Sequence, residues 1–191
     1  KYLLENVGVG AACRAGRRFP SVVPKLTKTV VDNISERELV DRSDRVFASP
    51  RKVRFVEMEY GIPIEAVGEA LERVGALHKS LHHPVLLPVE VRCSAADDIP
   101  LSTGTGRTNG WIAVHQYRGM PYEYYFRAVE SIMDDYGGRP HWGKLHFQTA
   151  DTLRDRYPDW EAAMRVRDRL DPNGTFANDE LDRVLGAVTA H

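Results

Sequence analysis

Hydrophobic residues recur every three to four positions along two stretches of the chain and alternate with polar residues along three others. The spacing of three to four predicts amphipathic helices over 64–81 and 122–138, and Gly137-Gly138 ends the second. The alternation predicts strands over 52–60, 111–119 and 84–95, the last of which alternates in its C-terminal half, although Glu57 and Glu59 fall on the same side as Phe55. The order of these elements indicates an α+β fold, in which an antiparallel sheet is flanked by helices.

The remaining segments suggest three regions. Residues 1–35 contain Pro20 and Pro24, which exclude one continuous helix, and 34–50 is expected to be a loop. The helical pattern after 149 is interrupted at Pro158 and ends in a short helix capped by Asn178 or Asp179. We therefore expect a substrate or cap domain over 36–148 and a C-terminal helical strap over 149–191. The chain opens on lysine, so we interpret 1–35 as a link to a missing N-terminal part.

Charge and cysteine content narrow the class of protein. The 26 basic and 27 acidic residues give a formal net charge of -1, which predicts no general attraction to nucleic acid. Cys13 and Cys93 form no C-x-x-C pair, so we expect two buried free thiols in a reducing, cytoplasmic compartment. No apolar run approaches the roughly 20 residues that span a bilayer.

Histidines raise the question of a metal site at two places. The segment 139–146, RPHWGKLH, contains His141 and His146, five positions apart on a stretch with no helical pattern. His78 and His82 are four apart and suit one helical face, but no third ligand accompanies them. We expect no metal at either place: His78 and His82 fit a solvated helix end, and His146 is interpreted as structural.

The glycine-rich segment 102–110, STGTGRTNG, resembles a phosphate-binding loop only superficially. Its spacing is G-x-G-x-x-x-G, and it precedes a strand instead of leading into a helix. A pyrophosphate site needs a helix N-terminus at the last glycine, where backbone amides and the helix dipole face the anion. We interpret the segment as a loop.

Charged residues on the predicted strands offer better candidates. Glu90 and Arg92 are two apart, so both side chains leave the same face of a strand that is otherwise apolar. Such a pair is either satisfied within the sheet or directed into a polar pocket, and the spacing leaves both open. His115 and Tyr117 repeat the pattern on the next strand, and Lys144 could cover the resulting pocket. The set contains no Ser-His-Asp or Cys-His nucleophile and suits binding a polyhydroxylated ligand beside a cofactor.

HWGK (141–144), the E-x-R of PVEVR (88–92) and DPNGTFANDELDRVLG (171–186) occur in an order that resembles the C-terminal region of the aldonolactone oxidoreductases. These are FAD enzymes of the vanillyl-alcohol oxidase superfamily that act on D-arabinono-, L-gulono- or L-galactono-lactones or, in the alditol oxidases, on polyols. DRSDRVFASPRKVRFVEMEYGIP (41–63) also resembles the family's cap region. The resemblance covers about 40–188, and the family's FAD-binding domain would lie N-terminal to it.

The resemblance implies roles for individual residues. Glu90 and Arg92 would be catalytic residues that contact substrate hydroxyls. His115 and Tyr117 would be neighbouring substrate-pocket residues. Lys144 would lie between flavin and substrate as a catalytic cation, beside His141 on the flavin. The implied partners are a sugar lactone or polyol and an electron acceptor, oxygen or a cytochrome, with peripheral membrane association of the full enzyme as an option. An FAD-free α+β binding module is the alternative from a different class of protein.

Overall fold

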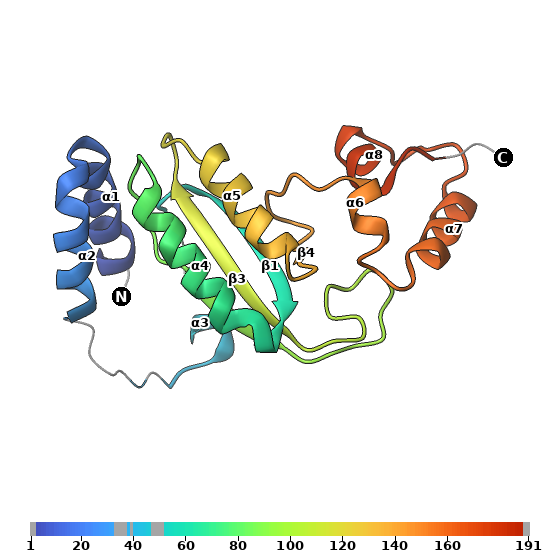
Figure 1. Cartoon of the computed structure of the whole chain (residues 1–191), viewed down its shortest axis with the longest axis horizontal. Helices are drawn as coiled ribbons and strands as arrows, with labels where there is room; N and C mark the ends of the chain where they lie inside the picture. The colour runs from blue at the N-terminus through green and yellow to red at the C-terminus, as the bar shows by residue number, and fades with distance from the viewer. Residues whose placement is uncertain (1–2, 33–37, 39, 47–51, 189–191) are drawn as a thin grey trace.

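The computed structural model describes residues 3–32, 38, 40–46 and 52–188, and Figure 1 shows a central sheet between an N-terminal helical hairpin and a C-terminal group of helices. The helical elements in chain order are η1 Leu3–Gly8, α1 Val9–Arg18, η2 Pro20–Val22, α2 Val23–Asp32, α3 Ser43–Val46, η3 Ile64–Ala66, α4 Val67–Ser80, α5 Glu123–Asp134, α6 Ala150–Arg154, α7 Trp160–Leu170 and α8 Asp179–Leu185. The strands are β1 Phe55–Pro63, β2 Glu90–Ser94, β3 Asn109–Tyr117 and β4 Arg139–Pro140.

The sheet has the strand order β2-β3-β1-β4, and every neighbouring pair is antiparallel. In the central pair, Glu57 lies opposite His115 and Glu59 lies opposite Ala113. On the other side of β3, Arg92 lies opposite Trp111. The predicted α+β fold, an antiparallel sheet flanked by helices, is confirmed.

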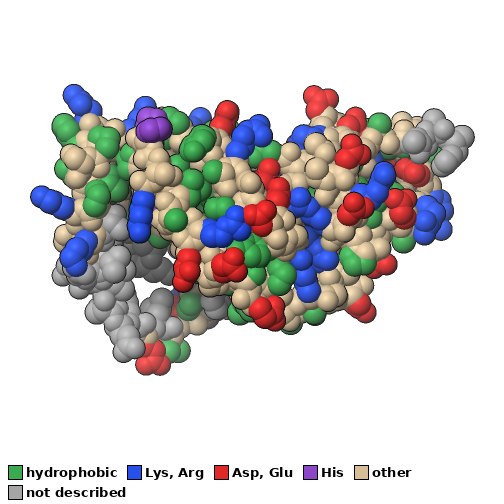
Figure 2. Space-filling model, viewed as in Figure 1, with side chains coloured by type: hydrophobic (Ala, Val, Ile, Leu, Met, Phe, Trp, Pro, Cys, Tyr) green, Lys and Arg blue, Asp and Glu red, His purple; other side chains and the backbone are tan. Residues whose placement is uncertain are grey.

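Helices α4 and α5 cover one face of this sheet (Figure 1). The core between them is formed by strand residues of one parity and by apolar helix residues, including Met58, Tyr60, Ile62, Ile112, Val114, Val74, Phe126 and Met133. All eight side chains are at most 1% exposed. On the outer side of these helices, acidic and basic side chains are interspersed, as expected of a solvated surface (Figure 2).

Strand β1 is therefore two-faced, and this explains its irregular sequence pattern. Met58, Tyr60 and Ile62 point toward the helices, whereas Glu57 and Glu59 alternate with them and point to the other face. The strand begins at Phe55 and continues to Pro63, so the prediction of 52–60 starts too early and ends too early. Both acidic side chains lie on the sheet face away from α4 and α5.

The predicted strand over 84–95 is wrong in its first half, because only Glu90–Ser94 pairs with β3. Pro84 and Pro88 lack the N–H that a sheet ladder requires. Their carbonyl oxygens are used by side chains of β3 instead. Gln116 Nε2 donates to Pro84 O at 3.2 Å, and His115 Nδ1 lies 3.0 Å from Pro88 O.

The C-terminal helices form as predicted. Pro158 lies between α6 and α7, and the Asn178 side chain caps α8 by accepting from Leu181 N at 3.0 Å. Helix α5 ends before Gly137, whose φ of +59° favours glycine. Arg139, the first residue of β4, is buried and donates to Thr103 O and other carbonyls, which fastens the loop before β3 to the C-terminal region.

The N-terminal predictions hold in part. Pro20 ends the first helix as expected, but Pro24 is tolerated in the first turn of α2, where backbone N–H groups have no helical acceptor. Part of the loop predicted over 34–50 lies outside the described residues, and Ser43–Val46 forms one helical turn. Cys13 is buried as expected, whereas Cys93 is exposed because its strand lies at the sheet edge.

Candidate functional site

The segment after β4 carries a turn onto the polar face of the sheet. His141 N donates to Glu59 O at 2.9 Å, and Leu145 N donates to Glu57 O at 3.0 Å, so both ends of the segment are fixed to the free edge of β1. Between them, Lys144 N donates to His141 O at 3.0 Å and closes a tight turn. These three backbone bonds aim the Lys144 side chain back across β1.

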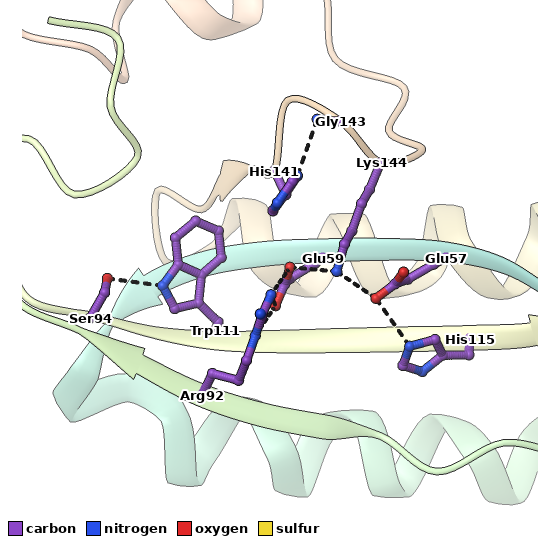
Figure 3. Close-up of polar contacts among 9 residues, drawn as sticks. All are labelled: Glu57, Glu59, Arg92, Ser94, Trp111, His115, His141, Gly143 and Lys144. Atoms are coloured by element: carbon purple, nitrogen blue, oxygen red, sulfur yellow. Dashed lines mark hydrogen bonds and ion pairs between the residues drawn. The ribbon is translucent and has the colours of Figure 1, made fainter. Parts of the chain in front are cut away.

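Lys144 reaches both acidic residues of β1 (Figure 3). Its Nζ lies 2.5 Å from Glu57 Oε1 and 2.7 Å from Glu59 Oε2. The Glu59 side chain is 0% exposed and the Lys144 side chain 17% exposed, so these ion pairs are largely shielded from water. The turn therefore places a fixed cation above the centre of the sheet.

Arg92 approaches Glu59 from the opposite side. Its Nε donates to Glu59 Oε1 at 2.9 Å and its Nη2 to Oε2 at 2.5 Å. Burial acts to raise the pKa of Glu59, but hydrogen bonds from Arg92 and then from Lys144 outweigh burial and lower it. The structure shows both predicted alternatives for Arg92, which pairs with Glu59 within the sheet and also lines a pocket. Glu90 lies on the same strand and adds a favourable charge near Arg92.

His115 joins the same cluster from β3. Its ring is 3% exposed; Nδ1 lies 3.0 Å from Pro88 O and Nε2 lies 3.1 Å from Glu57 Oε1. The ring of Phe55 packs edge-on against it, with centroids 5.1 Å apart. Glu57 thus contacts His115 and Lys144 through one carboxylate oxygen.

A pocket of about 440 Å³ opens beside Arg92 and is lined by Arg92, Cys93, Ser94, Thr103, Trp111, His141 and Trp142. Trp111 lies on the polar face and donates from Nε1 to Ser94 Oγ at 2.9 Å. His141 packs against it with ring centroids 6.1 Å apart. The pocket combines flat aromatic walls with an arginine whose side chain is 54% exposed.

The structure brings five of the predicted site residues to the polar face, namely Lys144, Arg92, His115, His141 and Glu90. Glu90 is on this face at the edge strand, opposite Ala113. Tyr117 lies further along β3, opposite Phe55, and among the described residues no hydrogen bond joins its side chain to the cluster.

Sequence reasoning missed Glu57, Glu59 and Trp111 as site residues. The signal for the two glutamates was their spacing of two on a strand whose intervening residues are apolar, the same pattern that singled out Glu90 and Arg92. Trp111 carried no comparable signal, because a tryptophan on a strand is usually core.

The other candidates belong elsewhere in the fold. His82 lies beyond the end of α4, and His78 is not a solvated helix end but packs on Tyr125, whose hydroxyl is 2.7 Å from its Nε2. Within 3–32, 38, 40–46 and 52–188, no three His, Cys, Asp or Glu side chains gather so as to hold a metal ion. His146 is buried edge-on against Trp142, and burial lowers its pKa to about 4. No described helix is long and apolar enough to cross a membrane.

Comparisons with known proteins show which family the chain belongs to. The family model for D-arabinono-1,4-lactone oxidase matches residues 1–184. The chain is 57% identical over 182 residues to L-gulono-1,4-lactone dehydrogenase of Mycobacterium tuberculosis, which covers 95% of this chain and 42% of that protein. It is 33% identical over 157 residues to L-gulonolactone oxidase of Mus musculus, covering 78% and 35%.

An alditol oxidase of Streptomyces is 32% identical over 133 residues, covering 68% of this chain and 31% of that protein. The chain thus spans less than half the length of the curated relatives it matches. The family match over nearly all residues confirms the resemblance carried by HWGK and E-x-R. The chain belongs to the D-arabinono-1,4-lactone oxidase family of aldonolactone oxidoreductases.

Proposed function

We propose that this chain forms the substrate-binding part of an FAD-dependent enzyme that oxidises a sugar 1,4-lactone of the D-arabinono or L-gulono type. The observation that carries the proposal is the cluster on the polar face, where Lys144 and Arg92 are both held by the buried carboxylate of Glu59 beside a pocket. The relatives named L-gulono-1,4-lactone dehydrogenase and L-gulonolactone oxidase support the substrate class.

The residues present fit a flavin at the edge of this pocket, although no FAD-binding domain is shown within the chain. His141 and Trp111 supply flat walls, and Lys144 supplies a cation beside them. In the proposal, Lys144 and His141 contact the flavin ring, while Glu90, Arg92, His115 and Tyr117 surround the sugar. When bound, the flavin would accept the hydride that leaves the carbinol carbon.

The chain's own residues would lower the barrier by preparing the hydroxyl group. Two cations near that oxygen favour its deprotonated form, and they act before the reaction because their carboxylate partners already fix their positions. Glu90 would orient the sugar and balance the positive charge. Lys144 is fixed at both the backbone and the side chain, so little reorganisation is needed.

The test uses the FAD-loaded enzyme that contains this segment, with Lys144→Met compared with Lys79→Met on the exposed end of α4. We expect flavin reduction by L-gulono- or D-arabinono-1,4-lactone, followed anaerobically by stopped-flow absorbance, to slow about 100- to 1,000-fold in Lys144→Met. The Lys79→Met control should keep the wild-type rate. Unchanged flavin reduction in Lys144→Met would show that Lys144 has no role in the hydride step.

Polyol oxidation is the second candidate, because a relative named alditol oxidase matches 68% of the chain. Reduction of the flavin by an alditol but by neither lactone would favour it. Turnover with oxygen and with cytochrome c as alternative acceptors then distinguishes an oxidase from a dehydrogenase.

A further inference from the structure

Both ring nitrogens of His115 face oxygen atoms that can accept hydrogen bonds. Nδ1 lies 3.0 Å from the carbonyl oxygen of Pro88, a group with no proton to give. Nε2 lies 3.1 Å from Glu57 Oε1. A neutral imidazole has one N–H and one lone pair, so it satisfies only one of these contacts and directs its lone pair at the other oxygen. The ring is 3% exposed, so water cannot readily intervene.

One additional proton would let both contacts of His115 be hydrogen bonds. The contact between Lys144 and Glu57 indicates whether this proton is on His115 or on Glu57. The same oxygen, Glu57 Oε1, lies 2.5 Å from Lys144 Nζ and accepts from it. An oxygen that accepts from an ammonium is best left as a carboxylate oxygen, which accepts a second hydrogen bond from His115. We propose that His115 is an imidazolium, protonated on both ring nitrogens, and that Glu57 is the positioning residue that holds it together with Lys144.

The charges around the ring support this assignment. From β1, Glu57 faces it directly, and the uncharged ring of Phe55 packs edge-on against it. From the turn, the Lys144 ammonium lies on the far side of the Glu57 oxygen. Glu59 and Arg92 neutralise one another next to this group, and Glu90 on β2 adds one more negative charge to the same face.

The consequence is one net positive charge on the five side chains of this cluster, with the negative charge of Glu90 as its counterpart at the sheet edge. Glu57 and Glu59 balance Lys144 and Arg92, so the proton on His115 leaves these five side chains with one net positive charge. A group developing negative charge above this face would be stabilised, since the cations are already oriented. That consequence for catalysis rests on the proposed function, whereas the protonation of His115 does not.

The decisive measurement is ¹⁵N NMR of the histidine rings in the full 191-residue chain at neutral pH, without any cofactor or substrate. His115→Asn identifies the His115 signals among the seven histidines. We expect both His115 nitrogens to give signals of the protonated type. In Glu57→Gln, the new amide can donate to Nε2, so that nitrogen should shift to the unprotonated type while Nδ1 stays protonated. Glu65→Gln, on the exposed start of the η3 turn, should leave both His115 signals unchanged.

A neutral His115 in the wild-type chain, with one nitrogen of the unprotonated type, would overturn the proposal whatever the variants show. Retention of both protons in a folded Glu57→Gln chain, checked by its amide spectrum, would equally overturn the role of Glu57. Because neither measurement involves a lactone, an imidazolium in an enzyme that fails to oxidise lactones rejects the proposed function alone. Lactone oxidation by an enzyme with a neutral His115 rejects this inference alone.

Discussion

Replacing Glu59 with glutamine probes the centre of the ion cluster. The substitution keeps the shape and volume of the side chain but removes its negative charge. Glu59 is 0% exposed at its side chain and accepts from Arg92 and from Lys144. In the variant, Arg92 and Lys144 therefore face a neutral amide. Its oxygen still accepts a hydrogen bond, but its NH2 group is a donor and forms none with either cation.

The size of the expected loss in the free energy of unfolding depends on which other partners Arg92 and Lys144 find in the variant. Breaking a buried ion pair by removing one partner costs about 3–5 kcal/mol, and a hydrogen bond to a charged group is worth about 1.5–3 kcal/mol. Arg92 is 54% exposed and regains water, and Lys144 keeps Glu57 as a partner. Both circumstances reduce the cost, so we expect Glu59→Gln to lower the free energy of unfolding by about 2–4 kcal/mol.

This loss should depend on pH. Burial opposes ionisation of Glu59, but the hydrogen bonds from Arg92 and Lys144 prevail, and its pKa in the folded state lies below its ordinary value. A group of this kind contributes full stability above its unfolded pKa of about 4.3 and loses it as the pH falls through the lower folded pKa. Protonated Glu59 resembles glutamine, so wild type and variant should converge in acid.

Urea unfolding of the full chain, followed by circular dichroism at neutral and at acidic pH, measures both effects. Glu65→Gln is the matched control, because the same chemical change at an exposed position should alter stability by less than about 0.5 kcal/mol. The reasoning fails if Glu59→Gln costs no more than this control at neutral pH, or if its cost stays constant as the pH falls.

Three further substitutions test the packing and the helices of the fold. In Gly110→Ala, the new Cβ would lie 2.0 Å from Val67 Cγ2, so urea unfolding should show a loss of about 1–3 kcal/mol, part of which Val67→Ala restores; an unchanged midpoint contradicts this. Gly75 lies on the exposed side of α4, where a Cβ added to it would meet nothing within 4 Å, so Gly75→Ala should raise stability by about 0.5–1 kcal/mol, and a lower melting temperature would refute this. Asn178→Ala removes the cap bond to Leu181 N and should cost about 0.5–2 kcal/mol in urea unfolding, whereas Asn178→Ser should retain most of the stability.

The elements that the sequence predicts well are those whose packing follows a simple period. Helices α4 and α5 bury one stripe each, and spacing alone located both within a few residues. The prediction over 84–95 is wrong in its first half, which is as apolar as a buried strand. Pro84 and Pro88 in this half have no backbone N–H to pair with a neighbouring strand, so the strand begins only at Glu90. Strand β4 spans only Arg139–Pro140 and carries no periodic pattern that could reveal it.

For the site, the sequence indicated the basic side chains better than their partners. Lys144, Arg92 and His115 were singled out as chemically capable groups, and the structure shows each of them on the polar face. Their shared partners are distant in the sequence: Glu59 is 33 positions from Arg92 and 85 from Lys144. Such pairings depend on strand order and on the turn after β4, and neither follows from local periodicity.

The two glutamates that interrupt the apolar sequence of β1 are informative about the structure around this strand. A solvated strand face needs no order among its charges, but Glu59 is completely buried, so its charge must be met by cations fixed by the fold. Strand β2 supplies one cation along the sheet, and the turn at 141–144 supplies the other from above it. Two acidic residues at spacing two on an otherwise apolar strand therefore predict a second layer of structure carrying positive charge, and in this chain that layer is the HWGK turn.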